Sequence, residues 1–233
     1  MPSEFDSFYT DLSDSSHRTA SVMFHIRFST NTSPKWHLAQ PYRVIAHNGE
    51  INTISGNRNW ALARMNNLSS KRFGNMRKYQ PLVNQSGSDS SSLDNMIEVL
   101  KEGGVNIGRA ARMLIPPSWQ NTDLMDSDEK AFHEYNSMHM EAWDGPALIC
   151  FQDKNFLSCF LDRNGLRPAR YVISKDRHIT LASEVGVYDY DDSEIIEKGR
   201  LAPGDMLAVD TLNGEVLQSD DINKIHKDRH PYE

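Results

Sequence analysis

Length, composition and charge exclude several classes of protein. The chain has 233 residues, of which 38% are hydrophobic and 24% charged, so it is long enough for one large domain or two small ones. The net charge of -7 and the lack of a long basic run argue against nucleic-acid binding, and no apolar run is long enough to predict a membrane span. Because the start of the chain is acidic and polar, unlike a signal peptide, we expect a cytoplasmic protein.

The first predicted element is a strand over residues 20–28. Apolar residues occupy every second position from Val22 to Phe28, which predicts one buried face. Arg27 lies on the opposite face, beside the hydroxyl and amide side chains of residues 29–32. A guanidinium on a rigid strand is well placed to bind a carboxylate through two parallel hydrogen bonds. The alternative is an exposed edge strand with an ordinary arginine.

A second apolar run, residues 42–46, leads into the sequence His47-Asn48-Gly49. Asn-Gly is a strong turn signal, so we expect backbone N–H groups and the Asn48 side-chain amide to be exposed at the end of a strand. Such groups can donate hydrogen bonds to a developing oxyanion. The pattern then becomes helical over about residues 56–68.

The loop of residues 85–92 precedes a third predicted element, a helix. Apolar residues recur at i, i+3, i+4 and i+7 over residues 93–100, and glycines follow at residue 103. Asp89 has two interpretations: it caps this helix, or its carboxylate binds the amino group of a ligand. Together with Arg27 it could hold the two charges of an α-amino acid.

Two more helices are predicted before the chain changes character. One covers residues 106–114 and the other about 127–142, where Asp126 and Glu129 form a capping pair. The apolar side of the second helix is expected to consist of Phe132, Tyr135 and Met138.

The remaining segments read as strands joined by tight turns, which imply antiparallel pairing. The expected pairs are 147–151 with 156–161, 170–174 with 179–183, and 204–210 with 215–217. Strands on both sides of a block of helices predict an α+β domain. We expect this domain to cover residues 1–221 and to be followed by a charged tail or the start of a linker at 222–233.

Neither cysteine has the surroundings of a nucleophile. Cys150 and Cys159 lie in apolar runs, without the polar neighbours or helix start that lower a thiol pKa, so we expect both to be buried. A metal site built from His25, His47 and Asp89 is a further alternative, but no HExxH or CxxC spacing supports it, and we expect no metal.

Long motifs give the chain a specific resemblance. The sequence HIRFSTNTSPKWHLAQPYRVIAHNGEINTISGNRNW closely resembles the glutamine amidotransferase type 2 domain of glutamate synthase large (alpha) subunits. The same domain is similar, in the same order, to QSGSDSSSLDNMIEVL, HEYNSMHMEAWDGPALICF, LDRNGLRPARYVISKDRHITLASEVGVY and KGRLAPGDMLAVDTLNGEV. The resemblance runs from about residue 8 to residue 221. It implies a four-layer αββα sandwich of the N-terminal nucleophile hydrolase type, truncated at its N-terminus.

The resemblance also implies residue roles, with L-glutamine as the substrate. Asn48 and Gly49 match the oxyanion hole of the family. The residues that match its glutamine-binding groups are Arg27, at the carboxylate, and Gly87, Ser88 and Asp89, at the amino group. No metal site is implied.

The family's nucleophile is a mature N-terminal cysteine, and this sequence has no matching residue. We therefore expect a fragment that lacks glutaminase activity by itself. No cofactor is implied in this chain, whereas FMN and an iron–sulfur cluster are implied in a separate synthase domain. The implied partners are the remainder of the large subunit and a small electron-donating subunit, with NADPH, NADH or ferredoxin as the donor. The alternatives are a non-catalytic amino-acid-binding module and another type 2 glutamine amidotransferase.

Overall fold

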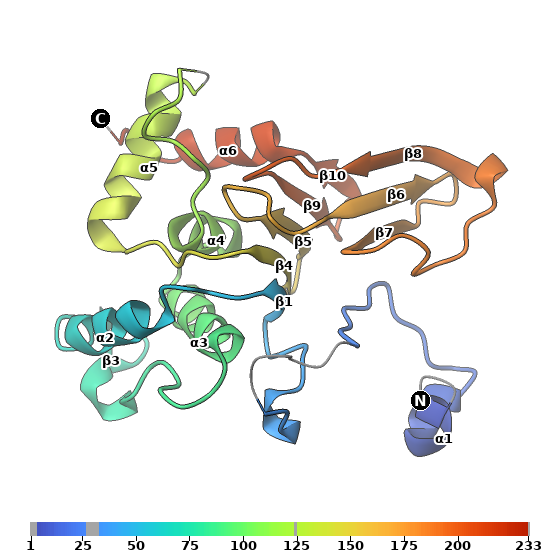
Figure 1. Cartoon of the computed structure of the whole chain (residues 1–233), viewed down its shortest axis with the longest axis horizontal. Helices are drawn as coiled ribbons and strands as arrows, with labels where there is room; N and C mark the ends of the chain where they lie inside the picture. The colour runs from blue at the N-terminus through green and yellow to red at the C-terminus, as the bar shows by residue number, and fades with distance from the viewer. Residues whose placement is uncertain (1–3, 27–32, 124, 233) are drawn as a thin grey trace.

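A computed structural model describes residues 4–26, 33–123 and 125–232, which form stacked sheets and a group of helices (Figure 1). The α-helices are α1 (Phe5–Phe8), α2 (Ile54–Arg64), α3 (Asp89–Glu102), α4 (Ile107–Leu114), α5 (Ser127–His139) and α6 (Ser219–Lys227). The strands are β1 (Ile45–Gly49), β2 (Ser69–Ser70), β3 (Gly74–Asn75), β4 (Ala147–Gln152), β5 (Phe156–Leu161), β6 (Arg170–Ser174), β7 (Ile179–Ala182), β8 (Ile195–Arg200), β9 (Met206–Asp210) and β10 (Glu215–Leu217). Short 3-10 helices cover Thr10–Ser13, Trp36–Leu38, Met76–Tyr79 and Asp192–Glu194.

The strands form a five-stranded sheet in the order β1-β4-β5-β9-β10 and a three-stranded sheet in the order β7-β6-β8. All pairs are antiparallel, so the three predicted strand pairs are confirmed. β1 lies at one edge of the larger sheet, where Gly49 is opposite Ala147 of β4. This edge position leaves one side of β1 open to other groups.

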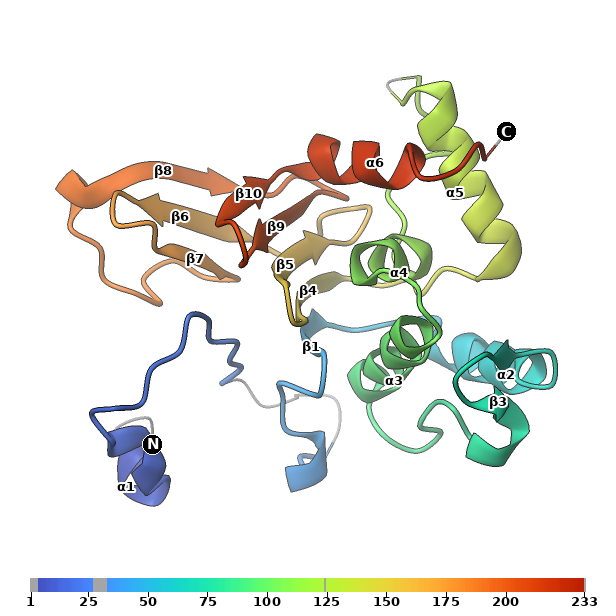
Figure 2. The same cartoon turned by 180° about the vertical axis from the view of Figure 1, so that it is seen from behind.

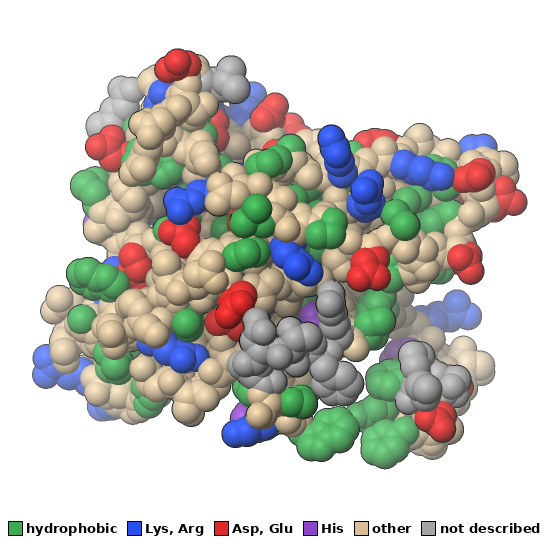
Figure 3. All heavy atoms as spheres, in the orientation of Figure 1, with side chains coloured by type: hydrophobic (Ala, Val, Ile, Leu, Met, Phe, Trp, Pro, Cys, Tyr) green, Lys and Arg blue, Asp and Glu red, His purple; other side chains and the backbone are tan. Residues whose placement is uncertain are grey.

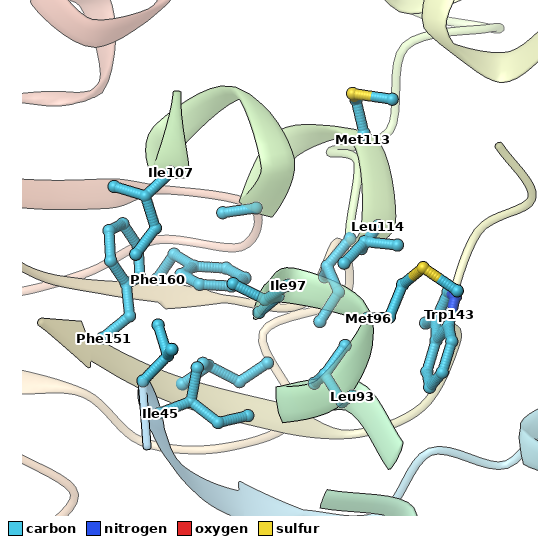
Figure 4. Close-up of a cluster of buried hydrophobic side chains, with 14 of the residues drawn as sticks. Ile45, Leu93, Met96, Ile97, Ile107, Met113, Leu114, Trp143, Phe151 and Phe160 are labelled. Carbon is cyan, nitrogen blue, oxygen red and sulfur yellow. The ribbon is translucent and has the colours of Figure 1, made fainter. Parts of the chain in front are cut away.

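One face of the five-stranded sheet packs against α3, α4 and α6. Figure 4 shows the contact, in which Ile45, Phe151 and Phe160 of the sheet meet Leu93 and Ile97 of α3. These side chains are at most 1% exposed. Burial of each such side chain stabilises the fold by roughly 1.5–3 kcal/mol, so this cluster fixes α3 against the sheet.

The other face of the five-stranded sheet packs against the three-stranded sheet. Leu148, Cys159 and Leu207 form a second buried cluster, against which Tyr171 and Leu181 of the smaller sheet pack. Figure 2 shows the helices and the smaller sheet from behind. The α+β class is thus confirmed, and three of the four expected layers are present among the described residues: helices, sheet and sheet.

The apolar period predicts α3, whose first residue is Asp89, so Asp89 does not cap this helix. Ser88 is its N-cap, accepting a hydrogen bond from the backbone N–H of Ser91, and Gly103 follows its last residue. Its apolar stripe is buried as expected. α4 likewise begins after an asparagine cap, at Asn106. The apolar period therefore predicts α3 correctly, and the expected helix over residues 106–114 is confirmed as α4.

In α5 the expected apolar side is only partly correct. Asp126 caps the helix and Phe132 is buried, as expected. However, Tyr135 is 38% exposed and Met138 is 71% exposed. Two other buried positions are filled by polar side chains: His133 stacks on Trp119, and Asn136 Oδ1 accepts hydrogen bonds from Arg109 of α4.

The predicted strand over residues 20–28 is wrong for its described part. Residues 21–26 adopt no regular structure, and Val22, Phe24 and Ile26 are 65%, 56% and 79% exposed. Alternation defines a face for burial, but a strand forms only when another strand pairs with it, and none of the described strands pairs here. Residues 27 and 28 lie outside the described residues.

Three further expectations need correction. His47-Asn48-Gly49 is not a turn, because these residues lie inside β1 and pair with β4. β8 was not expected, since its sequence, IIEKGR, alternates only weakly. The expected tail begins with helix α6, whose Ile222 and His226 are buried, so the domain continues at least to Lys227.

The surface gives two coarse observations. No helix in the described ranges is both long and apolar enough to cross a bilayer. On the face shown in Figure 3, acidic and basic side chains are interspersed over both the helices and the sheets.

Candidate functional site

The open edge of β1 is closed in part by other groups of the same chain. Successive strand residues direct their backbone groups alternately toward the paired strand and away from it. The outward C=O of Ile45 accepts a hydrogen bond from the Tyr42 N–H (2.8 Å). At His47 the Gln40 side chain replaces a neighbouring strand: its Oε1 accepts from the His47 N–H (2.6 Å) and its Nε2 donates to the His47 C=O (3.0 Å).

Gly49 is the next outward-facing residue, and no described residue accepts a hydrogen bond from its N–H. The Glu50 N–H points back to the Pro146 C=O (2.9 Å), in keeping with the alternation. The Ile51 N–H faces outward again and donates to Asp89 Oδ2 (2.7 Å). The free donor at Gly49 is therefore followed, two residues along the same edge, by a carboxylate.

A glycine is required at this donor. The φ of Gly49 is +155°, and a Cβ at this position would lie 1.8 Å from the Pro146 carbonyl oxygen. Gly145 mirrors this arrangement, since its Cβ would lie 1.9 Å from the Glu50 carbonyl oxygen. The two glycines let the end of β1 and the segment before β4 pass in close contact, which fixes the direction of the Gly49 N–H.

Asp89 and His47 join the start of α3 to β1. Asp89 is the first residue of α3, where the helix dipole favours a negative charge, and its side chain remains 20% exposed. His47 Nδ1 lies 2.8 Å from Ser90 Oγ and 3.8 Å from Asp89 Oδ2. Burial lowers the pKa of His47, and the nearby Asp89 charge opposes this shift only in part. His47 therefore acts as a buried, neutral hydrogen-bonding group.

Gly87 and Ser88 shape the loop that presents Asp89. The Gly87 N–H donates to Asn84 Oδ1 (2.7 Å), and the Gly87 C=O accepts from Arg58 Nη2 (2.7 Å). The Ser88 hydroxyl caps α3 and also forms a hydrogen bond with the Tyr42 hydroxyl (2.8 Å). These polar groups are thus used within the protein, while part of the Asp89 carboxylate stays accessible.

Asn48 faces the opposite side of β1 from His47, as expected for neighbouring strand residues. Arg167 Nη2 donates to Asn48 Oδ1 at 2.6 Å. Arg167 follows the turn of residues 162–166 and lies 119 positions away in the sequence. No spacing around Arg167 predicts this role from the sequence; its signal is its place within the motif DRNGLRPARY.

The other candidate residues lie elsewhere. Arg27 is outside the described residues. Cys150 and Cys159 are free and lie opposite each other in β4 and β5, with Cys159 in the core between the two sheets. Burial raises the pKa of the Cys159 thiol well above its ordinary value. Neither position suits a thiolate nucleophile at the edge of β1.

In the described ranges, no group of three or more His, Cys, Asp or Glu side chains is arranged to hold a metal ion. A hollow of about 210 Å³ lies beside the start of β4, lined in part by Trp143, Asp144 and Asp162. The site itself thus consists of one backbone donor, one side-chain amide and one carboxylate along a strand edge.

Comparison with known proteins identifies the family. The family model for class-II glutamine amidotransferases matches residues 1–233. The chain belongs to this family. Over 233 residues it is 43% identical to the Bacillus subtilis glutamate synthase [NADPH] large chain, and this match covers 100% of this chain and 15% of that relative. Over 229 residues it is 45% identical to the Synechocystis ferredoxin-dependent glutamate synthase 2, and this match covers 97% of this chain and 15% of that relative.

These class-II relatives are much longer than the chain, which spans 15% of each. Among solved structures, a match is found to glutamine phosphoribosylpyrophosphate amidotransferase from B. subtilis, complexed with ADP and GMP. It has 16% sequence identity and a TM-score of 0.45, and the match covers 83% of this chain and 34% of that chain.

Proposed function

We propose that this chain is the glutamine-binding part of a glutamate synthase glutaminase domain. In this function L-glutamine is hydrolysed to glutamate and ammonia, and the ammonia is transferred reductively to 2-oxoglutarate elsewhere in the enzyme. The identity of 43–45% to glutamate synthases supports this choice over other class-II glutamine amidotransferases.

The observation that carries the proposal is the spacing along the edge of β1. Among the described residues the Gly49 N–H has no acceptor, and the Ile51 N–H, two residues further on, donates to Asp89. Gly49 is the last residue of β1, and two residues of extended chain span about 6.6–6.8 Å. In glutamine, four carbon atoms separate the α-ammonium group from the carboxamide oxygen, a reach of the same order. The carboxamide oxygen at Gly49 and the ammonium group at Asp89 would each meet a group of opposite polarity.

The remaining roles follow from this placement. Asn48 donates a second hydrogen bond to the carboxamide oxygen, so that Asn48 and Gly49 together stabilise the oxyanion. Gly87 and Ser88 hold Asp89 in position. Arg27 binds the glutamine α-carboxylate, an assignment that rests on the resemblance of its motif.

The nucleophile is assigned to neither cysteine. Burial raises the pKa of the Cys159 thiol, which makes it a poor nucleophile. The contact with Cys159 lowers the pKa of the half-buried Cys150, but Cys150 lies on β4 and not at the open edge of β1. We therefore expect the 233-residue chain by itself to bind glutamine without releasing ammonia. Ammonia release that is lost on Cys150→Ser or Cys159→Ser substitution would contradict this assignment.

The synthase reaction is assigned to other parts of the enzyme. The chain has two cysteines, fewer than the four thiolates that usually hold an iron–sulfur cluster, so we place this cluster and FMN in the remainder of the large subunit. A small electron-donating subunit is a further proposed partner. The free cysteines are in keeping with a cytoplasmic location.

The test is glutamine binding to the 233-residue chain, measured by isothermal titration calorimetry. We expect L-glutamine to bind, and Asp89→Asn to weaken binding about tenfold or more, because a charge-assisted hydrogen bond contributes roughly 1.5–3 kcal/mol. Asp128→Asn is the matched control, since Asp128 is an exposed acid in the first turn of α5.

The outcomes separate the candidate functions. Equal glutamine affinities of the wild type and Asp89→Asn would contradict the proposed site. A non-catalytic amino-acid-binding module is the second candidate, favoured by the placement of both cysteines in the sheet. It predicts binding of several amino acids with similar affinity, whereas a glutaminase site should discriminate against amino acids that lack the carboxamide.

A further inference from the structure

The contact between Arg167 and Asn48 fixes which way the Asn48 amide faces. A side-chain amide presents an oxygen on one side and an NH₂ group on the other, and the two are readily exchanged by rotation. A guanidinium group has donors only. The atom 2.6 Å from Arg167 Nη2 must therefore be the oxygen, Oδ1, and the Asn48 Nδ2 group is turned away from Arg167.

The Asn48 Nδ2 group is left free for a ligand. No described residue accepts a hydrogen bond from it, and Asn48 is only partly buried. If the amide were rotated, its NH₂ group would face the donors of Arg167, and the oxygen would face the ligand. An oxygen in that place repels a developing oxyanion, so one orientation of Asn48 supports the proposed chemistry and the other opposes it.

Arg167 is itself held by a rigid turn. The buried Asp162 accepts hydrogen bonds from the Ala147 N–H (2.9 Å) through Oδ1 and from the Asn164 N–H (3.0 Å) through Oδ2. Ala147 is the β4 residue opposite Gly49. The turn before Arg167 is thereby bonded to the same strand pair, β1 and β4, that carries the Gly49 N–H. Arg167 and the Gly49 N–H are therefore held in fixed positions relative to each other.

We propose that Arg167 is a positioning residue that locks the Asn48 amide with its Nδ2 group toward the carboxamide oxygen of glutamine. The inference rests on the proposed function and adds to it a residue that does not touch the substrate. The guanidinium group acts through the orientation of Asn48, to whose Oδ1 it donates a hydrogen bond.

The test compares two ligands on the 233-residue chain, by calorimetry or by NMR titration where binding is weak. L-glutamine carries the carboxamide, whereas L-norvaline has the same carbon skeleton up to Cδ and no oxygen there. Arg167→Met should weaken glutamine binding about fivefold, the factor expected for the loss of one neutral hydrogen bond. Norvaline binding should not change, and Arg167→Lys should restore part of the glutamine affinity, because lysine retains a donor.

Arg163→Met is the matched control. Arg163 lies in the same turn, is partly exposed and forms an ion pair with Asp144 (3.1 Å). Its replacement should leave both affinities unchanged. A loss of glutamine and norvaline binding by the same factor in Arg167→Met would show a general structural role and overturn the inference, as would an unchanged glutamine affinity.

A second readout separates this inference from the proposed function. In the ¹H–¹⁵N correlation spectrum of the wild type, the Asn48 side-chain NH₂ group should give two sharp ¹H resonances at one ¹⁵N shift, which Arg167→Met should broaden or shift and Arg163→Met should not. Insensitivity of these resonances to Arg167→Met would overturn the inference whatever the ligand. If they respond but the wild type binds glutamine no better than norvaline, the positioning contact stands and the proposed function fails.

Discussion

At the scale of single residues, Gly49 combines two properties that depend on each other. Its lack of a side chain permits the close contact with the Pro146 carbonyl, and this contact directs its N–H outward. A backbone donor held in this way needs no reorganisation to meet a ligand.

Replacement of this glycine should be costly. In Gly49→Ala, the new Cβ would overlap the Pro146 carbonyl oxygen, so the strand end must move. We expect the free energy of unfolding to fall by about 2 kcal/mol or more, as for other overpacked sites, and glutamine binding to be lost. Urea unfolding followed by circular dichroism would measure the first effect.

The control for this substitution is Gly56→Ala in α2. No atom lies within 4 Å of a Cβ at Gly56, and alanine favours a helix by roughly 0.5–1 kcal/mol over glycine. The control should be neutral or slightly stabilising. If both variants unfold at the urea concentration of the wild type, a side chain at residue 49 does not destabilise the strand end, and the close contact at Gly49 does not require a glycine.

The sequence alone predicts some of the site residues and not others. Asn48, Gly49 and Asp89 stand in short motifs with recognisable chemistry, so a single sequence can suggest them. Gln40 contacts His47, only seven residues away, from a loop without a predicted element. Arg167 acts through a contact across the fold, which joins positions 119 residues apart. A sequence carries no local sign of such a contact, because the sheet that brings the two residues together does not exist until the chain folds.

At the scale of elements, the position of β1 depends on α3. The Asp94 carboxylate of α3 is buried and accepts hydrogen bonds from the Val44 N–H (2.9 Å) and the Ile45 N–H (3.0 Å) through one oxygen. Burial raises the pKa of Asp94, although these two bonds lower it in part. One helix thus anchors the start of β1 with Asp94 and its far end with Asp89.

Removal of the buried acceptor should weaken this contact. Asp94→Ala leaves the N–H groups of Val44 and Ile45 without a partner, at a cost of roughly 1–3 kcal/mol for each buried group. We expect a loss of about 2–5 kcal/mol in the free energy of unfolding. Asp94→Asn keeps an acceptor oxygen and should lose less than half of this, so equal losses in urea unfolding would refute the hydrogen-bond explanation.

The strands show why element prediction from sequence is uneven. A hairpin such as β4–β5 pairs two strands that are adjacent in the sequence, and the residues of the turn between them predict it. Residues 20–26 have an equally clear alternation, yet they form no strand, because pairing depends on a partner that alternation does not specify. The same limit explains β8, whose pairing with β6 stabilises a sequence with little intrinsic pattern.

At the scale of the whole molecule, α6 packs against α5 through a buried histidine. His226 is 3% exposed, its ring is stacked on that of Phe132 (5.9 Å between centroids), and its ring nitrogens have no hydrogen-bond partner in the described part of the chain. Burial, followed by the charges of Arg112, Arg229 and Arg109, lowers the pKa of His226 to about 4.

The lowered pKa makes the stability of the molecule dependent on pH. Above pH 6.5, His226 is neutral in the folded and the unfolded chain. Between pH 6.5 and 4 the unfolded chain binds more protons, so the free energy of unfolding should fall by about 2 kcal/mol from pH 7 to pH 5 through this group. Below pH 4 this contribution is fully lost.

A variant isolates this contribution. His226→Phe keeps an aromatic ring against Phe132 and removes the titrating group, so its unfolding free energy should change less between pH 7 and pH 5 than that of the wild type. His133, whose pKa is also lowered by burial, remains in both proteins, so part of the pH dependence should persist in His226→Phe. His17→Phe, at an exposed position, should retain the wild-type dependence. Identical pH profiles for His226→Phe and the wild type would argue against a buried neutral His226.

The open edge of β1 has a consequence for assembly as well as for binding. A foreign strand can add to a sheet only where a row of backbone groups is unpaired. Along this edge, other groups of the chain bond the backbone. Tyr42 donates to the Ile45 C=O, Gln40 bonds both backbone groups of His47, and Asp89 accepts from the Ile51 N–H. Among the described residues, the gap that remains along this edge is one residue wide, which is too short to template a peptide strand. The same side chains that leave a donor for a small molecule therefore protect this edge of the sheet, and not the opposite edge at β10, from edge-to-edge aggregation.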